Sequence, residues 1–369
     1  MASTAVSLFL CGDVMLGRGV DQVLPHPGDP HLREEFVGDA RGYVRSAEAV
    51  NGPIPRPVEY TWPWGEALAV LDDAQPDVRI VNLETSVTSE GDFAPYKAVH
   101  YRMNPGNLPA LAAVSPDACV LANNHVLDFG RAGLLETLDV LHGAGLRTVG
   151  AGRDAGEAAR PAVLRTAEGA RVVVAAFGMP SSGVPVDWAA AEHTAGVDFL
   201  ADASEESADH VLERVARVAE PGDVVVVSIH WGGNWGYDVD RAMSTFACRL
   251  IDGGVDVVHG HSSHHPRAVQ VYHGKLILYG CGDCVDDYEG ISGYEYYRDD
   301  LRLLYLATVR PDDGDLLDLR MVPMQARRMR LRHAGRDDAE WLATTLSRVS
   351  RPFGCDVGVD ADGDLAVLR

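Results

Sequence analysis

Five short hydrophobic runs punctuate the sequence, and each is nearly continuous in apolar character and rich in β-branched residues. Such runs are typical of strands that are covered on both faces, as in parallel sheets. We therefore predict core strands at residues 6–10, 78–81, 119–122, 224–229 and 255–258. Helical spacing of the apolar residues predicts helices at 65–74, 130–143, 204–219 and 337–348.

After residue 266 the apolar residues recur with a period of two. This alternation predicts antiparallel strands at 268–272, 276–279, 301–309 and 318–324. The order of elements predicts an α/β protein with one main domain, residues 1–330. Residues 331–369 are expected to form a small helical extension packed on that domain.

Residues 24–63 interrupt the succession of strands and helices with seven prolines. We interpret this segment as an insertion into the main domain. Long proline-rich loops serve either as lids over a site or as simple surface wrapping, and the sequence leaves both readings open.

Each of the five runs ends in residues that can hold a metal ion. The carboxyl ends of parallel strands meet at one edge of a sheet, so these residues are expected to converge. Taken singly, an aspartate there could cap a helix, an asparagine could sit in a turn, and a histidine could be buried in the core. The ordered recurrence favours a metal centre built from Cys11-Gly12-Asp13, Asn82-Leu83-Glu84, Asn123-Asn124-His125, His230-Trp231-Gly232 and His259-Gly260-His261.

Composition narrows the classes of function. The formal net charge of -22 argues against nonspecific binding to nucleic acid or to an anionic membrane surface, because both need a basic field. Hydrophobic residues make up 46% of the chain, enough for a large core, yet no apolar stretch reaches the length of a membrane span. The six cysteines are scattered and are expected to be reduced. We expect a cytoplasmic protein.

Several of these motifs carry a family resemblance. Residues 12–18, 81–84, 122–125 and 229–232, followed by Gly260-His261, resemble the CapA family, which is associated with poly-γ-glutamate capsule synthesis. The resemblance covers about residues 5–330 and places the chain in the calcineurin-like metallophosphatase superfamily. It implies a four-layer αββα sandwich with the metal at the carboxyl edges of the strands.

The resemblance also implies a ligand set. Met15 and Ser263 stand where the superfamily's first metal site has histidines, so a second ion is expected to be weak or absent. Asp13, the aspartate of that first site, is present and is expected to lie beside the remaining ion. The sequence does not distinguish manganese, zinc, iron and calcium. One divalent ion is expected on Glu84, Asn124, His230 and His261.

Around this ion, His125 is expected either to contact the reacting group or to support the ligands from behind. Asp128 would either orient the His125 imidazole or cap the helix that starts nearby, and Asp283 is expected to support the site. With one ion weakened, Asp13 and one histidine of the pair His264 and His265 would be free to act as acid and base.

Our specific hypothesis is epimerisation at the α-carbon of a peptide residue, the C-terminal one, in the manner of the soluble lasso-peptide epimerases that resemble CapA. The ion would stabilise the charge that develops on deprotonation. The alternatives are a metallohydrolase of a phosphoester or γ-glutamyl bond, and an accessory protein of poly-γ-glutamate synthesis.

The expected substrate is a peptide or a poly-amino acid with a carboxylate. Arg18, Lys97 and Arg102 are candidates to hold that carboxylate, although they could equally neutralise acidic surface. Trp231 and Trp235 are candidates to line a pocket for an apolar side chain, or are half-buried packing.

Overall fold

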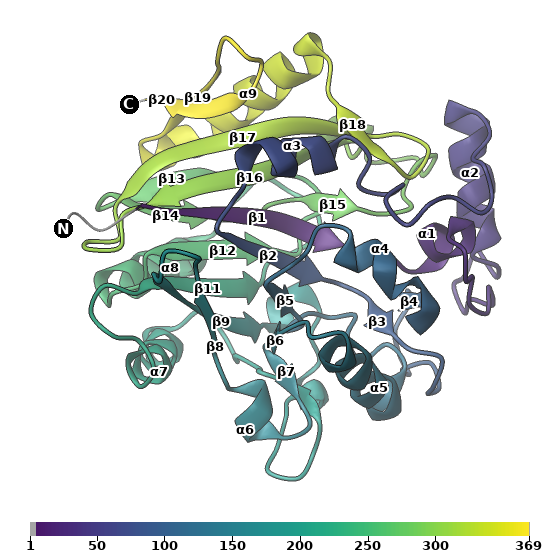
Figure 1. Ribbon diagram of the computed structural model, residues 1–369, viewed down its shortest axis with the longest axis horizontal. Helices are drawn as coiled ribbons and strands as arrows, with labels where there is room; N and C mark the ends of the chain where they lie inside the picture. The colour runs from purple at the N-terminus through teal and green to yellow at the C-terminus, as the bar shows by residue number, and fades with distance from the viewer. Residues whose placement is uncertain (1–4, 369) are drawn as a thin grey trace.

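The computed structural model describes residues 5–368, and its centre is a pair of β-sheets packed face to face (Figure 1). In the larger sheet, β1, β2, β5 and β6 run parallel, and β16 pairs antiparallel with β1. The strand order is β19 (Asp356–Val359), β20 (Leu365–Leu368), β17 (Leu316–Ala326), β16 (Leu301–Val309), β1 (Val6–Val14), β2 (Val78–Leu83), β5 (Ala118–Val120) and β6 (Thr148–Val149), with β15 (Asp283–Val285) on β1 and β18 (Leu331–His333) on β17.

The smaller sheet has a parallel centre of β9, β11, β12 and β14, flanked by antiparallel strands. Its order is β13 (Val269–Tyr272), β14 (Lys275–Leu278), β12 (Val257–His261), β11 (Val224–His230), β9 (Arg171–Gly178) and β8 (Ala162–Arg165). Two further pairs are short: β3 (Ser86–Val87) with β4 (Arg102–Met103), and β7 (Ala151–Gly152) with β10 (Gly196–Val197).

Helices lie against the outer faces of the two sheets. The larger sheet packs against α3 (Ala67–Ala74), α4 (Leu108–Ala112) and α5 (Gly130–Gly143), with α1 (Arg18–Val23) and α2 (Arg41–Asn51) beside them. The smaller sheet packs against α7 (Glu205–Ala216) and α8 (Arg241–Asp252). The remaining helices are α6 (Ala155–Ala158) and α9 (Arg336–Ser350).

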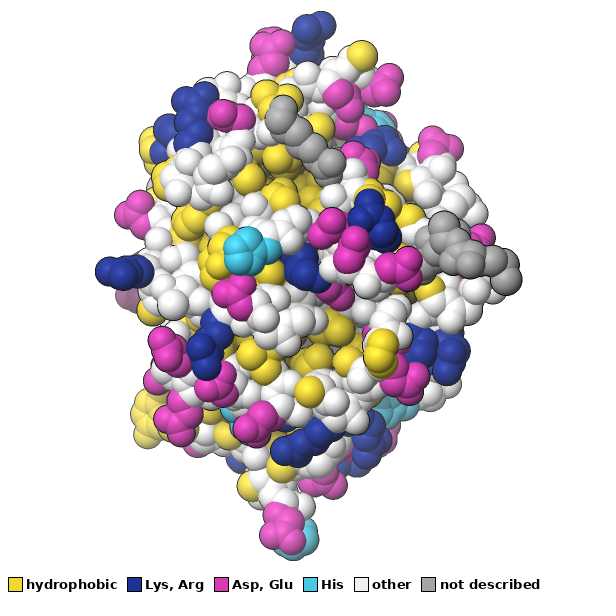
Figure 2. Space-filling model, turned by 90° about the vertical axis from the view of Figure 1, so that its left-hand side faces the viewer, with side chains coloured by type: hydrophobic (Ala, Val, Ile, Leu, Met, Phe, Trp, Pro, Cys, Tyr) yellow, Lys and Arg dark blue, Asp and Glu magenta, His cyan; other side chains and the backbone are white. Residues whose placement is uncertain are grey.

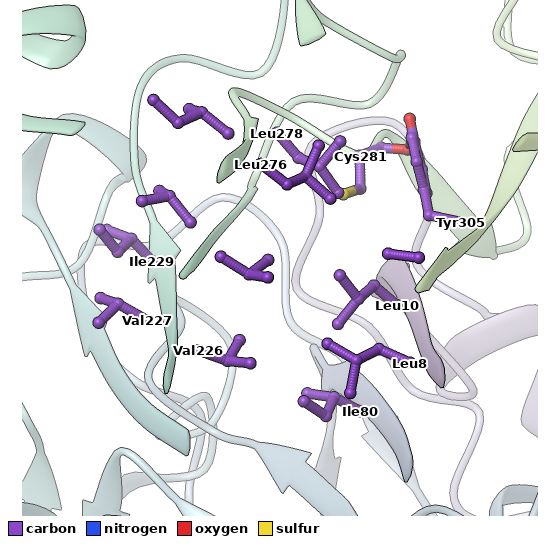
Figure 3. Close-up of a cluster of buried hydrophobic side chains, with 14 of the residues drawn as sticks. Leu8, Leu10, Ile80, Val226, Val227, Ile229, Leu276, Leu278, Cys281 and Tyr305 are labelled. Atoms are coloured by element: carbon purple, nitrogen blue, oxygen red, sulfur yellow. Dashed lines mark hydrogen bonds between the residues drawn. The ribbon is translucent and has the colours of Figure 1, made fainter. Parts of the chain in front are cut away.

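The hydrophobic core has two parts because the side chains of a strand alternate between its faces. On β1, Leu8 and Leu10 point into the core between the sheets, where they join Val226 and Leu276 (Figure 3). The intervening Phe9 belongs to the second cluster, under the helices. Strands buried on both faces explain why the sequence shows continuous apolar runs there. The arrangement is the α/β sandwich that the sequence analysis predicts.

Three features differ from the predicted elements. The insertion 24–63 contains α2, and α8 occupies a stretch for which no helix is predicted. The segment after residue 330 is not only helical, because β18, β19 and β20 continue the larger sheet beyond β17. A strand of four residues or fewer shows too little alternation of apolar and polar residues to be recognised from the sequence alone.

Charged side chains of both signs are interspersed over the face shown in Figure 2. Within residues 5–368, no helix combines the length and the apolar character that crossing a membrane requires.

Candidate metal centre and adjoining pocket

Three buried carboxyl groups meet where the first strands end. Asp13 lies at the end of β1, Glu84 follows β2, and Asp283 begins β15. Each is at most 1% exposed. Asp13 and Asp283 are paired residues of neighbouring parallel strands, which brings their side chains to the same edge of the sheet.

The backbone around Asp13 is unusually close to its neighbour. A Cβ atom at Gly12 would lie 1.6 Å from the carbonyl oxygen of Gly282, so only glycine allows the approach. The Asp13 carboxylate then accepts hydrogen bonds from Asn82 Nδ2 at 2.7 Å and from the Ser262 backbone N at 3.2 Å. These contacts fix its orientation.

The crowding of carboxyl groups changes their acidity. Burial and the nearby Asp283 carboxylate raise the pKa of Asp13 to about 7, against the opposing hydrogen bonds from Glu84 and Asn82. Burial and the Asp13 carboxylate likewise raise the pKa of Glu84 well above its ordinary value. One oxygen of Glu84, Oε2, and one of Asp283, Oδ2, are buried without a hydrogen-bond partner. Unpaired carboxylate oxygens in a buried site suit a divalent cation.

A chain of hydrogen bonds sets the proton positions on two histidines. His259 Nε2 lies 2.9 Å from the carbonyl oxygen of Cys11, which can only accept, so the Nδ1 of neutral His259 is an acceptor. Ser228 Oγ bridges this Nδ1, at 3.0 Å, and His261 Nε2, at 2.9 Å. His261 Nε2 therefore donates to Ser228, and a lone pair remains on His261 Nδ1.

That lone pair faces His230. The two Nδ1 atoms of His230 and His261 are 2.8 Å apart, a contact that either a proton or a shared cation satisfies. Burial lowers the pKa of both imidazoles well below the ordinary value, so both are neutral, as metal ligation requires. His230 Nε2 also lies 3.1 Å from Asn124 Oδ1 and 3.6 Å from Glu84 Oε1.

The ligand atoms of Asp13, His230 and His261 lie within 4.8 Å of one another. Glu84 and Asn124 adjoin them through the contacts with His230. This mixed oxygen and nitrogen set fits a transition-metal ion. A second set with the same spacing consists of Asp13, His264 and Asp283.

His125 approaches from the loop after β5. Its Nδ1 lies 2.7 Å from Asp128 Oδ2, and its Nε2 lies 3.7 Å from Glu84 Oε1. Lys97 completes this group, with its Nζ 3.0 Å from His125 Nδ1 and bonded to the Asp128 carboxylate. Burial and the Lys97 charge hold the pKa of His125 well below its ordinary value, so this imidazole is neutral.

The two neighbouring histidines 264 and 265 point to different surroundings. His264 Nδ1 lies 2.8 Å from Asp283 Oδ1, while its Nε2 contacts Asn234 at 2.9 Å and the Tyr288 hydroxyl at 3.4 Å. Burial alone would lower the pKa of His264, but the Asp283 carboxylate outweighs it and raises that pKa. His264 thus belongs to the carboxyl cluster.

His265 instead packs among aromatic rings. Its ring stacks on Tyr297 with centroids 4.6 Å apart and contacts the Tyr237 ring edge-on. Its Nδ1 lies 3.1 Å from the Pro266 carbonyl oxygen. Burial lowers the pKa of His265 to about 4, so the side chain is neutral. It lies outside both sets of converging ligand atoms.

A cavity of about 220 Å³ opens beside His264. Its wall is largely aromatic and includes Tyr101, Tyr288 and Trp235. Tyr43, from α2, also lines it, so the insertion 24–63 supplies part of the wall. His264 is shared between this cavity and the carboxyl cluster, which makes the cavity the natural place for a reacting substrate group.

A known protein family matches most of this chain. The family described as "Bacterial capsule synthesis protein PGA_cap" matches residues 7–288. The chain belongs to this family. It is 53% identical over 364 residues to a "Probable polyglutamine synthesis accessory protein" of Mycobacterium tuberculosis. The aligned region covers 98% of this chain and 96% of that protein. The CapA resemblance predicted from the motifs is thereby confirmed.

One further relative and one solved structure are similar to this chain at lower sequence identity. The "PGA biosynthesis protein CapA" of Bacillus subtilis is 24% identical over 300 residues, covering 81% of this chain and 67% of that one. Among solved structures, one titled as a novel phosphatase from Mycoplasma pneumoniae shares 11% identity, with a TM-score of 0.47 over 88% of this chain and 94% of that one.

Arg18 lies at the cavity wall of this PGA_cap family member, yet four of the five N–H donors of its guanidinium are already bonded to protein groups. Its guanidinium binds Asp287 through two nitrogens, at 3.1 and 2.5 Å, and Glu34 at 2.9 Å. It also lies over the Tyr43 ring, 3.8 Å from the centroid. Arg18 therefore braces the wall, which corrects the expectation that it captures the substrate terminus.

Two further predicted substrate contacts lie elsewhere. Arg102 sits 3.5 Å over the Phe129 ring and donates to the Gly91 carbonyl oxygen, away from the cavity. Trp231 is 1% exposed and donates its indole N–H to the Tyr279 carbonyl oxygen, so it is a core residue. Continuous apolar context in the sequence already favours the core for a tryptophan at the end of a buried strand.

The remaining predicted residues lie at the site. Glu84, Asn124, His230, His261, Asp13 and His264 come together as described, and Trp235 lines the cavity. Asp128 and Asp283 each accept from a histidine, the position expected of an orienting carboxylate. Lys97, predicted to hold a substrate carboxylate, does not line the cavity and directs its ammonium at the Asn124 carbonyl oxygen, His125 Nδ1 and the Asp128 carboxylate, so it holds the loop of residues 124–128.

Sequence reasoning missed several supporting residues. Ser228 stands two positions before the predicted ligand His230, and the period of two along a strand places it on the same face. That signal was available. Tyr101 and Tyr288 had no comparable signal, because only the folded chain brings these distant residues to the same wall.

The raised pKa of Asp13 gives a pH-dependent prediction. Below pH 7 the carboxyl group is largely protonated, so an ion has to displace the proton, and affinity rises as the pH is raised through about 7. One displaced proton changes the affinity by about tenfold per pH unit below this pKa and leaves it level above, so the affinities at pH 6 and pH 8 should differ by about tenfold in total. Titration calorimetry with Mn²⁺ at pH 6 and pH 8 measures this change. The Asp13→Asn variant should show a flatter profile, and an equally steep one would exclude Asp13 as the titrating group.

Proposed function

We propose that this protein is a metal-dependent enzyme that acts on a peptide or poly-amino acid bearing a carboxylate. The observation that carries the proposal is the position of His264, which lines the cavity and belongs to the buried carboxyl cluster. Substrate bound in the cavity would therefore lie next to both an acid/base group and the metal ligands.

Glu84, Asn124, His230 and His261 would hold the ion, with Asp13 at its side. Once bound, a divalent ion supplies positive charge that acidifies groups attached to a coordinated carboxylate or amide oxygen. The hydrogen bond from His261 Nε2 to Ser228 keeps this imidazole in the tautomer that ligation needs.

The specific reaction we propose is epimerisation at an α-carbon. One group of the pair Asp13 and His264 removes the α-proton, and the other returns a proton to the opposite face, so substrate and product have the same atoms. His264 is positioned for this by Asp283 on Nδ1, which leaves Nε2 directed at Tyr288 and Asn234 of the cavity wall. Asp13 is the second group of the pair because its carboxylate and the ring nitrogen of His264 lie within 4.8 Å of each other.

Solvent isotope exchange tests the reaction. Purified protein loaded with Mn²⁺ is incubated in deuterated water with glutamyl peptides and with peptides ending in an aromatic residue. Epimerisation puts one deuterium on the α-carbon and is detected by mass spectrometry and chiral amino-acid analysis. An absence of α-deuterium, together with metal-dependent release of phosphate or of a peptide fragment, would replace this proposal with hydrolysis.

Hydrolysis is the second candidate, and a specific observation favours it. The converging ligand atoms of Asp13, His264 and Asp283 provide a place for a second ion, although Met15 and Ser263 occupy the positions of the superfamily's histidines. Two ions could activate water and neutralise a phosphoryl or acyl oxygen together. Two ions per chain would favour the hydrolase, and one ion favours the epimerase.

An accessory role in the synthesis of a glutamate polymer is the third candidate. It draws on the names of two relatives, a polyglutamine synthesis accessory protein and a PGA biosynthesis protein. This role is compatible with either reaction, because an accessory protein can modify the ends or links of a polymer that another enzyme makes.

A further inference from the structure

A second cavity, of about 410 Å³, lies on the turn that joins β17 to β18. Asn51 at the end of α2 and Glu66 next to α3 form one side. Four arginines form the other, and in a chain with a net charge of -22 such a concentration of positive charge is exceptional. They are Arg327, Arg328, Arg330 and Arg332.

None of these four guanidinium groups forms an ion pair with a carboxylate among residues 5–368. Arg332 donates to Gln325 at 3.1 Å, and Arg330 lies over the Trp62 ring, 5.0 Å from its centroid. Many other arginines do have acidic partners, as Arg214 has with Asp198. Glu66 is the one acidic residue that lines the cavity, so the four arginines leave its lining with an excess of positive charge.

The turn that presents the arginines is fixed in position. Arg328 and Met329 adopt φ angles of 60° and 52°, in the left-handed region, and the Glu289 carboxylate accepts their backbone N–H groups at 2.6 and 2.5 Å. Trp62 Nε1 donates to the Arg328 carbonyl oxygen at 2.9 Å. Because Glu289 is engaged with backbone donors, it orders the turn and leaves the guanidinium groups available.

The same segment connects the two cavities. Tyr288 and Ile291 line the cavity beside His264, and Glu289, between them in sequence, holds the arginine turn. Met329 of the turn packs against α1 at Gly19, one residue from Arg18 in the first cavity's wall. A long chain could therefore occupy both cavities around this segment.

We propose that the arginine cavity binds a stretch of a polycarboxylate chain, a glutamate polymer, at a distance from the metal ligands. Guanidinium groups match carboxylates in bidentate geometry, and four on one turn match the regular spacing of acidic side chains along a polymer. The acidic remainder of the surface repels a polyanion, so binding concentrates at this cavity. The choice of a glutamate polymer as the ligand rests on the proposed function.

The test uses the full-length protein with two pairs of substitutions. R327Q/R330Q removes two exposed charges from the cavity, and R217Q/R241Q removes two exposed charges elsewhere that also lack ion-pair partners among residues 5–368. Fluorescence anisotropy with labelled poly-γ-glutamate at low salt measures Kd. We expect R327Q/R330Q to weaken binding by about tenfold or more, and R217Q/R241Q to leave it within about twofold.

Glu84→Gln separates this inference from the proposed function. Glu84→Gln should lose the metal ion but keep the arginine-dependent part of polymer binding, so adding R327Q/R330Q to it should still weaken binding by about tenfold, and R327Q/R330Q alone should keep its metal ion. Equal weakening in both arginine pairs, or loss of polymer binding in Glu84→Gln, overturns the arginine site. Tighter binding of single-stranded DNA or polyphosphate of equal charge would overturn the polycarboxylate and identify a phosphate polymer as the ligand.

Discussion

Replacing Glu84 with glutamine is expected to weaken divalent-ion binding by more than about 100-fold and to abolish turnover. Residues that only support ligands cost 10–100-fold when changed, and Glu84 is itself placed as a ligand, with a buried Oε2 that has no other partner. Glutamine has nearly the same shape, so the fold should survive. Because the buried Glu84 carboxyl group is crowded by Asp13, the ion-free variant should be at least as stable as the wild type.

Thermal unfolding with and without Mn²⁺ measures the loss. An ion at about 100 times its Kd stabilises the wild type by about 2.7 kcal/mol, and this increment should vanish in Glu84→Gln. The matched control is Glu90→Gln, the same substitution at an exposed site, which should keep the full increment. An undiminished increment in Glu84→Gln would place the ion elsewhere and remove the basis of the proposed enzyme.

Replacing His264 with asparagine is expected to reduce turnover by about 10²–10⁴-fold, the usual contribution of a general acid or base. The reason is that His264 Nε2 faces the cavity while Asp283 holds Nδ1 at 2.8 Å. In the epimerase, His264→Asn should bind one ion as tightly as the wild type. Elemental analysis of the purified variant measures that ion, and α-deuterium incorporation measures the turnover.

The neighbouring residue provides the control. His265→Asn alters an imidazole that stacks on Tyr297 and lies outside the converging ligand atoms, so turnover should stay within a few-fold of the wild type. Asp13→Asn should lose turnover as His264→Asn does if both residues are proton carriers, while its ion binding should depend less on pH. If instead an ion is lost in His264→Asn, His264 is a ligand of a second ion and the hydrolase is favoured.

The distinction between His264 and His265 illustrates where sequence reasoning stops. Both follow His261 closely, and the sequence offers no reason to prefer either. The positive φ of Ser262, 106°, redirects the chain after β12, so His264 turns toward Asp283 and His265 turns toward the aromatic residues. Such a local bend depends on packing against residues far away in the sequence.

The sequence also does not reveal which arginines are free to bind a ligand, as Arg18 shows. Its place after the first motif made it a reasonable candidate for binding a carboxylate, but Asp287, 269 residues away, already occupies the guanidinium. The arginines of the β17–β18 turn remain free, although nothing in their sequence neighbourhood predicts a cavity. Which arginine is available is decided by which carboxylates the fold brings close.

The sequence by itself determined the α/β class, the strands that carry the ligands and the family, because continuous apolar runs and strand-end motifs are local patterns with a direct physical meaning. The tertiary structure alone decided which histidine faces the cavity, which arginines are paired, and which tyrosines form the cavity wall. These outcomes depend on distances between residues that are remote along the chain, and such distances are fixed only when the two sheets pack together.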